Sequence, residues 1–161
     1  MKNAIFPILI TFFLFSFGCV YQGTKPLVVV NYGDAAARAE FDALELDSVY
    51  VNLLRTIQNE QDGDTLYNRW LSFHKNLAQR VKEKNFNWGK KDSSVIIWDR
   101  VYCNQDGNIQ YYIYNVIDST VTEERKMAYG ELIKSLDPPL IYNVRRETPY
   151  AQCGSYRHYV Y

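Results

Sequence analysis

The sequence has little of what nucleic-acid-binding proteins and proteins with several transmembrane helices need. Its 161 residues carry 18 basic and 18 acidic side chains, so the basic excess that attracts phosphate groups is missing. We therefore expect no nucleic-acid partner. The sequence after the N-terminus contains no apolar run of 18 residues, which excludes a protein that crosses a membrane several times. The length suits a single ordinary domain.

Side chains that carry most enzyme and metal chemistry are also scarce. The histidines and cysteines are His74, His158, Cys19, Cys103 and Cys153. Their spacing matches no zinc motif, and the sequence has no nucleophile elbow, HExxH motif or glycine-rich phosphate loop. Asp62 and Asp64 flank a glycine as in a calcium loop, but Arg69 stands where that loop needs its twelfth-position glutamate. We predict a non-enzymatic protein with no cofactor and no metal site.

The first eighteen residues predict an export signal. Lys2 supplies a positive charge, and residues 5–17 form an apolar stretch shorter than the roughly 20 residues of a transmembrane helix. Gly18 and Cys19 follow at once, and this junction resembles the lipobox of bacterial lipoproteins, in which the cysteine becomes acylated. Ser16 and Gly18 also satisfy the small-x-small rule of ordinary signal peptidase, so an unlipidated secreted form is the alternative.

Lipidation at Cys19 also fits the number of cysteines. We expect residues 1–18 to be removed, residues 19–33 to form a lipidated tether and residues 34–161 to form one domain. In an oxidising compartment Cys103 and Cys153 are then expected to form a disulfide bond. The alternative is that both remain buried free thiols.

Helical signals dominate the first half of the domain. Residues 27–30 predict a short strand or part of the tether, and Asp34 is placed to cap an alanine-rich helix. A second helix is expected to start at Asp47 and to end at residues 62–64. The strongest signal covers residues 64–84, where one face carries an apolar stripe: Leu66, Trp70, Phe73, Leu77 and Val81.

The second half changes to strand periodicity. Residues 94–103 and 108–117 are rich in β-branched and aromatic side chains, and the Asp106–Gly107 turn between them predicts a hairpin. A capping box over residues 120–123 starts a helix that ends at Asp137 and two prolines. Residues 140–146 and 154–161 are expected to be strands. The predicted fold is α+β, with N-terminal helices followed by a ββαββ antiparallel sheet.

Tyrosine is unusually frequent, with 14 residues, all after position 20. Tyrosine and arginine are enriched in protein interfaces, so a tyrosine-rich face or edge of the sheet is a candidate binding surface. The candidate residues are Tyr102, Tyr112, Tyr114, Arg145, Arg157 and Tyr159. The alternative is that tyrosine is frequent here only because it forms strands well.

The order of elements after about residue 64 resembles that of the C-terminal domain of TonB-type energy-transducing proteins. The resemblance rests on an amphipathic helix, the hairpin with its NQDGN turn at residues 104–108, the helix over 122–136 and the strand expected over 140–146. That family's membrane-spanning helix and proline-rich linker have no counterpart here, and Cys103 and Cys153 are not features of it. The resemblance implies a protein-binding domain in which an exposed strand edge pairs with a partner segment, rather than energy transduction.

Together these features predict a lipoprotein of the Gram-negative cell envelope, anchored by its lipid, with the outer membrane favoured. Its expected role is to bind another protein through a tyrosine-rich face or edge of the sheet. Two alternatives stay open. One is an immunity or inhibitor lipoprotein that neutralises a toxin or hydrolase, and the other is a small envelope enzyme that uses His74 or His158 beside an acid or nucleophile.

Overall fold

The computed structural model describes residues 26–90 and 94–159. Its strands are β1 (Val28–Asn31), β2 (Val51–Asn52), β3 (Ser94–Cys103), β4 (Ile109–Val116) and β5 (Tyr150–Tyr159). Its α-helices are α1 (Ala35–Asp42), α2 (Glu60–Glu83) and α3 (Glu123–Lys134), with two short 3-10 helices, η1 (Leu46–Ser48) and η2 (Leu53–Thr56). The predicted signal peptide and the lipidation site at Cys19 lie outside the described residues.

The sheet is mixed, and β3 is its central strand. The strand order is β1-β4-β3-β5-β2, with β3 antiparallel to both β4 and β5. The outer strands run parallel to their neighbours: β1 to β4, and β2 to β5. The α+β class is therefore confirmed, while the sheet is not the purely antiparallel arrangement that the sequence predicted. Residues 28–31, assigned to the tether, form the edge strand β1.

The expected strand over residues 140–146 is not formed. Its only sheet-like contact is an isolated bridge between Ile141 and Asn108. Its main chain is held by the hairpin turn instead, because Tyr142 N donates to Gly107 O over 2.9 Å and Arg146 N donates to Gln105 O over 3.0 Å. The segment thus wraps the tip of the β3–β4 hairpin and leads into β5.

The apolar stripe of α2 is buried as predicted, but the helix begins earlier than expected. Asn59 is the N-cap, and its side chain accepts from Asp62 N over 2.9 Å. Gly63 therefore lies inside the first turns of α2 and does not end a preceding helix. The helix expected from Asp47 is absent from the described chain, where η1, β2 and η2 occupy that segment.

The other helix starts follow ordinary capping chemistry. Asp34 caps α1 as predicted, and its carboxylate accepts from the backbone N–H groups of the second and third helical residues. Thr122 caps α3 by accepting from Arg125 N, two residues later than the predicted start. The side chain of Thr120 instead donates to Asp118.

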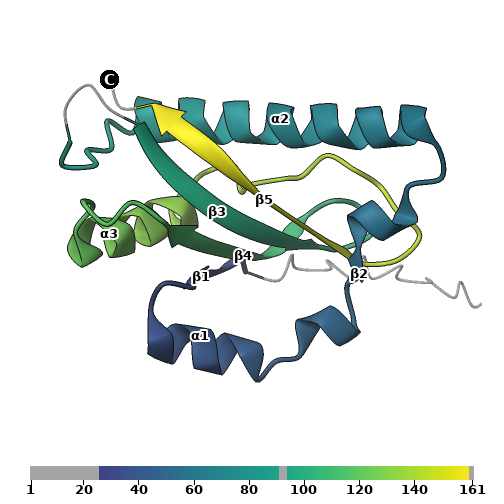
Figure 1. The fold of residues 1–161 in the computed structure, drawn as a ribbon, viewed down its shortest axis with the longest axis horizontal. Coiled ribbons are helices and arrows are strands. Elements are labelled where there is room, and N and C mark those ends of the chain that lie inside the picture. The colour runs from purple at the N-terminus through teal and green to yellow at the C-terminus, as the bar shows by residue number, and fades with distance from the viewer. Residues whose placement is uncertain (1–25, 91–93, 160–161) are drawn as a thin grey trace, which may run out of the picture.

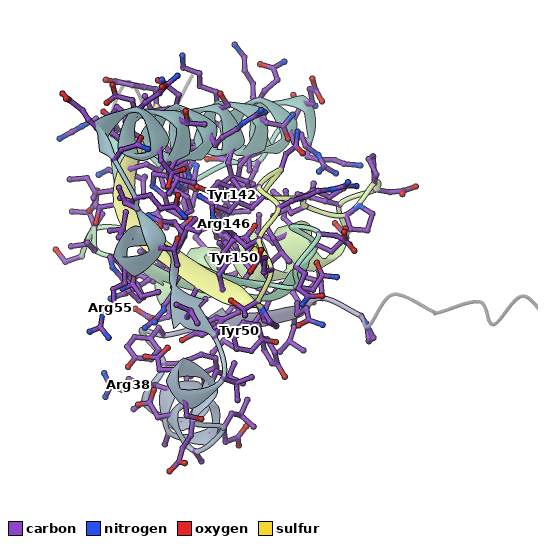
Figure 2. All side chains as sticks on the ribbon, turned by 90° about the vertical axis from the view of Figure 1, so that its right-hand side faces the viewer. Arg38, Tyr50, Arg55, Tyr142, Arg146 and Tyr150 are labelled. Atoms are coloured by element: carbon purple, nitrogen blue, oxygen red, sulfur yellow. The ribbon has the colours of Figure 1, made fainter. Side chains whose placement is uncertain are left out.

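The sheet is covered on both faces (Figure 1). Helix α2 lies along one face and α1 lies against the other. The main core lies between the sheet and helices α2 and α3. A smaller core on the α1 face contains Phe41, Tyr50, Tyr102, Tyr111, Ile113 and Ala151. Figure 2 shows Tyr142 and Tyr150 between α2 and the sheet, and Tyr50 between the sheet and α1.

A comparison of two glycines with positive φ tests how closely residues 140–146 pack on the hairpin turn. Gly107 has φ +86°, and a Cβ there would lie 2.4 Å from Tyr142 O. Gly89 has φ +77°, but a Cβ there would only come within 4.0 Å of Arg125 Cγ, an ordinary van der Waals contact. We expect Gly107→Ala to cost about 3 kcal/mol of unfolding free energy, and Gly89→Ala only about 1 kcal/mol, in urea titrations. Equal losses would contradict the close packing of residues 140–146 on the turn.

Candidate functional site

The six candidate binding residues do not form one surface. Tyr102, Tyr112 and Tyr114 are buried, and they do not share a face of the sheet. Tyr102 faces α1 and donates its hydroxyl proton to Asp47, whereas Tyr112 and Tyr114 face the helices of the main core. Arg145 is exposed on the loop that leads into β5.

Arg157 and Tyr159 remain at the surface, both on β5. Their side chains point to the same face of the sheet because they are two residues apart in one strand. Tyr159 is 60% exposed, and Arg157 donates to Ser94 Oγ over 2.7 Å. The surface that sequence reasoning expected is therefore reduced to its β5 part.

The two cysteines of the domain are free thiols. Cys103 pairs with Tyr150 in the sheet and lies in the main core, whereas Cys153 pairs with Arg100 and lies on the α1 face. Side chains on opposite faces of a sheet cannot approach to the distance of a disulfide bond without backbone movement. The structure therefore does not bring the expected disulfide partners together.

The outer edge of β5 is the longest unpaired strand edge in the described chain. β3 pairs with β5 along its whole length, from Tyr150 to Tyr159. On the other side, β2 covers only Tyr150 and Ala151 before the chain turns into η2. Residues 153–159 thus have no strand beside them among the described residues. In Figure 1, β5 is the yellow strand in front of β3.

The register shows which main-chain groups point outward from this edge. Val51 N donates to Pro149 O, so the odd-numbered residues direct their N–H and C=O groups away from β3. The β3–β5 register has no bulge, so this alternation continues through Ser155, Arg157 and Tyr159. Cys153 O already accepts from Gln152 Nε2 over 3.2 Å, so the main-chain groups to which an additional strand can hydrogen-bond are those of Ser155, Arg157 and Tyr159.

Helix α2 packs over β5 on one face of the sheet and borders this edge. Trp70 lies directly over Gly154, where a Cβ would come within 2.7 Å of the indole Nε1, and His74 stacks on Tyr156 with ring centroids 4.0 Å apart. On the side of α2 away from the 138–143 loop, Tyr67 is 63% exposed and Leu71 is 38% exposed. We call Tyr67, Leu71 and Lys75, which follow one another at four-residue spacing, the α2 flank.

A chain of buried polar groups lies under α2. Asp99, in the middle of β3, is fully buried, and its Oδ2 accepts from the Tyr112 hydroxyl over 2.9 Å. The Tyr112 hydroxyl lies 3.1 Å from that of Tyr129, which lies 2.9 Å from that of Tyr156. Asp99 Oδ1 and His74 Nε2 are 3.6 Å apart, and neither has a hydrogen-bond partner among the described residues.

Burial shifts the pKa values of Asp99 and His74 in this cluster. It raises the pKa of Asp99 well above its ordinary value, although the Tyr112 hydrogen bond acts in the opposite direction. It also lowers the pKa of His74 to about 3. Burial therefore favours the neutral form of each group, which avoids an isolated charge in the core. His158 is likewise buried, against Trp88.

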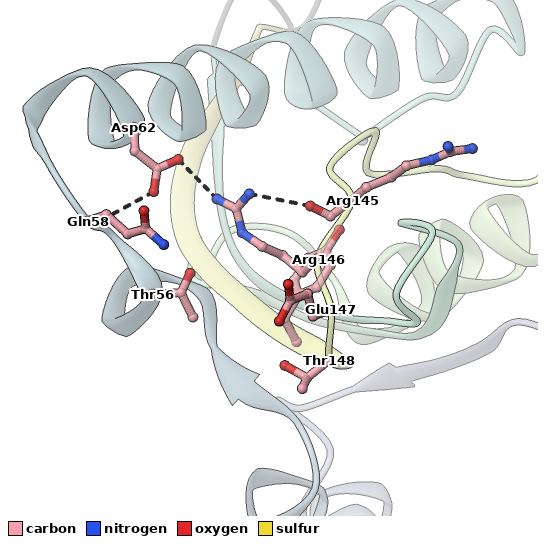
Figure 3. Close-up of a pocket in the computed structure, with 8 residues that line it drawn as sticks. Thr56, Gln58, Asp62, Arg145, Arg146, Glu147 and Thr148 are labelled. Atoms are coloured by element: carbon pink, nitrogen blue, oxygen red, sulfur yellow. Dashed lines mark hydrogen bonds and ion pairs between the residues drawn. The ribbon is translucent and has the colours of Figure 1, made fainter.

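A cavity of about 660 Å³ lies between the start of α2 and the loop before β5 (Figure 3). Arg146 crosses it and forms an ion pair with Asp62 at 3.1 Å, and Asp62 also accepts from Gln58 N over 3.4 Å. Arg145 and Glu147 complete its charged lining, which holds two cations and two anions. Because the charges balance, the arrangement explains how the loop is fastened to α2 but indicates no ligand.

Comparison with protein-family models, curated proteins and solved structures finds no match to this chain. Among the described residues, no helix combines the length and the apolar character needed to span a membrane. The same residues contain no group of three or more histidine, cysteine or acidic side chains arranged to hold a metal ion.

The buried histidine makes a testable contribution to acid stability. The pKa of His74 is about 3 in the folded chain and 6.5 in the unfolded chain, so unfolding takes up a proton between these values. Stability is therefore lost as pH falls from 6.5 towards 3. His74→Phe keeps an aromatic ring on Tyr156. Between pH 6.5 and pH 3, we expect this variant to lose about 4 kcal/mol less unfolding free energy than the wild type.

Urea titrations at several pH values measure this difference. Asp99→Asn serves as the comparison, because the raised pKa of Asp99 acts with the opposite sign and lowers stability as pH rises above 3.8. That variant should keep the acid-induced loss and gain stability at neutral pH. Identical pH profiles for His74→Phe and the wild type would show that His74 is not buried in its neutral form.

Proposed function

We propose that this protein is a non-enzymatic lipoprotein of the bacterial cell envelope that binds another protein by adding a partner strand to the edge of β5. The single observation that carries the proposal is the unpaired edge over residues 153–159. Natural sheets usually shorten, bend or cover their edges, because an open edge invites pairing with other chains. An open edge of this length is therefore a feature that a binding function explains.

The other parts of the proposal come from the sequence. The apolar stretch before Cys19 supports export and lipidation. The order of α2, hairpin, α3 and a following strand supports the resemblance to TonB C-terminal domains, although that strand is β5 and not residues 140–146. Edge pairing is the mode of binding that this resemblance implies.

The alternatives have less support from the site. An envelope enzyme would need a histidine that meets its substrate, whereas both histidines are buried, with His74 6% and His158 5% exposed. An inhibitor that inserts a loop into its target would need a protruding loop, whereas the loop of residues 140–146 is packed against the hairpin turn. The open edge favours strand addition over both.

Site-specific photo-crosslinking in intact cells tests the proposal. A benzoylphenylalanine at Arg157 on the edge should give a discrete adduct whose cross-linked peptide maps to one extended segment of a partner protein. The same probe at Glu131, which is exposed on α3, is the matched control and should give none. Equal adducts at both positions, or none at Arg157, would overturn the proposal.

A proline at Ser155 separates edge pairing from simple proximity. Ser155 directs its N–H outward, so Ser155→Pro removes a donor from the edge while the β3–β5 hydrogen bonds remain. We expect this variant to lose at least about nine-tenths of the adduct at position 157 while its melting temperature changes by only a few degrees. Retention of the full adduct would show that the partner does not pair with the strand.

The lipid anchor has its own test. Replacing Cys19 by serine removes the thiol that would be acylated, and a chain without this lipid has no anchor of the proposed kind. We expect Cys19→Ser to move the protein from the membrane fraction to the soluble fraction, measured by fractionation and immunoblotting. Continued membrane retention in a high-salt wash would refute the anchor.

A further inference from the structure

Resting on the proposed function, we infer that the segment added to β5 is an acidic one with alternating aliphatic residues, supplied by a different protein rather than by a second copy of this chain. The site has two sides. The β5 edge would hydrogen-bond to the main chain of the added strand, and the α2 flank would contact its side chains. The exposed side chains around this site determine which segment fits.

The first requirement concerns shape and polarity on the helix side. Side chains of an added strand alternate between the two faces of the sheet, so every second one points towards the layer of α2. A side chain that points this way meets Tyr67 and Leu71 of the α2 flank. Both are large side chains whose apolar surface is exposed to solvent. Aliphatic residues at these positions would remove that surface from water.

The second requirement concerns charge. Arg157 on β5, Arg55 on η2 and Lys75 on the α2 flank are all exposed, and none of them has an acidic partner among the described residues. Figure 2 shows Arg55 projecting outward on the side where β5 lies. Arg157 points to the face opposite α2, which is also where the remaining side chains of the added strand point. A cation without a counter-charge on that face favours acidic residues at those positions, while Lys75 adds positive charge on the α2 side.

The same charges argue against self-association. Two copies that paired their β5 edges would do so antiparallel about a two-fold axis, so that each residue meets its symmetry mate or a near neighbour. Residues 153–159 carry Arg157 and no acidic side chain, so a second copy of this edge would add positive charge and supply no counter-charge. Like charges would then oppose each other across the axis, which is destabilising for adjacent strands.

Defined peptides test this inference on the purified full chain. The probes are acetylated, amidated peptides of about eight residues that alternate valine with glutamate, lysine or glutamine. Calorimetry at about 20 mM salt should show the glutamate peptide binding at least about tenfold more tightly than the lysine peptide, with the difference shrinking at about 500 mM salt. Ser155→Pro should abolish binding, and the double variant Lys75→Glu and Arg157→Glu should reverse the charge preference.

The control for the charge variants is Lys134→Glu together with Lys126→Glu on α3, which should leave the preference unchanged. Equal binding of the glutamate and lysine peptides, if abolished by Ser155→Pro, would overturn the acidic preference while the edge-binding function stands. Sedimentation that reveals a dimer lost in Ser155→Pro would overturn the choice of a different protein as partner. Failure of the proposed function itself is seen separately, as the absence of the cellular adduct at Arg157.

Discussion

The main-chain hydrogen bonding of β3 on both of its sides is the constraint on which the structure depends. This strand pairs with β4 from Ile97 to Cys103 and with β5 along all ten residues. Because β4 and β5 both pair with β3, the side chains of these three strands that point towards α2 lie on one face of the sheet. The outer strands β1 and β2 are too short to organise a sheet alone, and they pair with strands already held by β3.

Local pattern was sufficient where one element determines its own geometry. The apolar stripe predicted the buried face of α2, the β-branched and aromatic content of residues 94–103 predicted a strand, and Asp34 predicted a helix start. β2 was missed, and residues 27–30 were left open between a strand and the tether, because a pattern of two to four residues carries no period and the pairing joins residues far apart in sequence. Residues 140–146 alternate like a strand, yet their hydrogen bonds go to the hairpin turn.

The candidate site was harder to predict from the sequence than the fold. The sequence grouped Tyr102 and Tyr112 as candidates for one surface, because it did not reveal that they lie on opposite faces of the sheet and that helices cover both. The open edge was also invisible, since which strand ends a sheet depends on topology and not on any residue within that strand. One signal was available: Tyr67 and Leu71 are large apolar residues four positions apart and outside the buried stripe.

Helix α2 joins the buried cluster to the surface. His74 lies beside Asp99 on its inner side and stacks on Tyr156 of β5, so the strand that carries the open edge packs on buried polar groups. The edges of the sheet are also unequal in length, with four residues in β1 and seven uncovered residues in β5. An added strand could therefore hydrogen-bond along a longer stretch at β5 than at β1, so the two edges are not equivalent pairing surfaces.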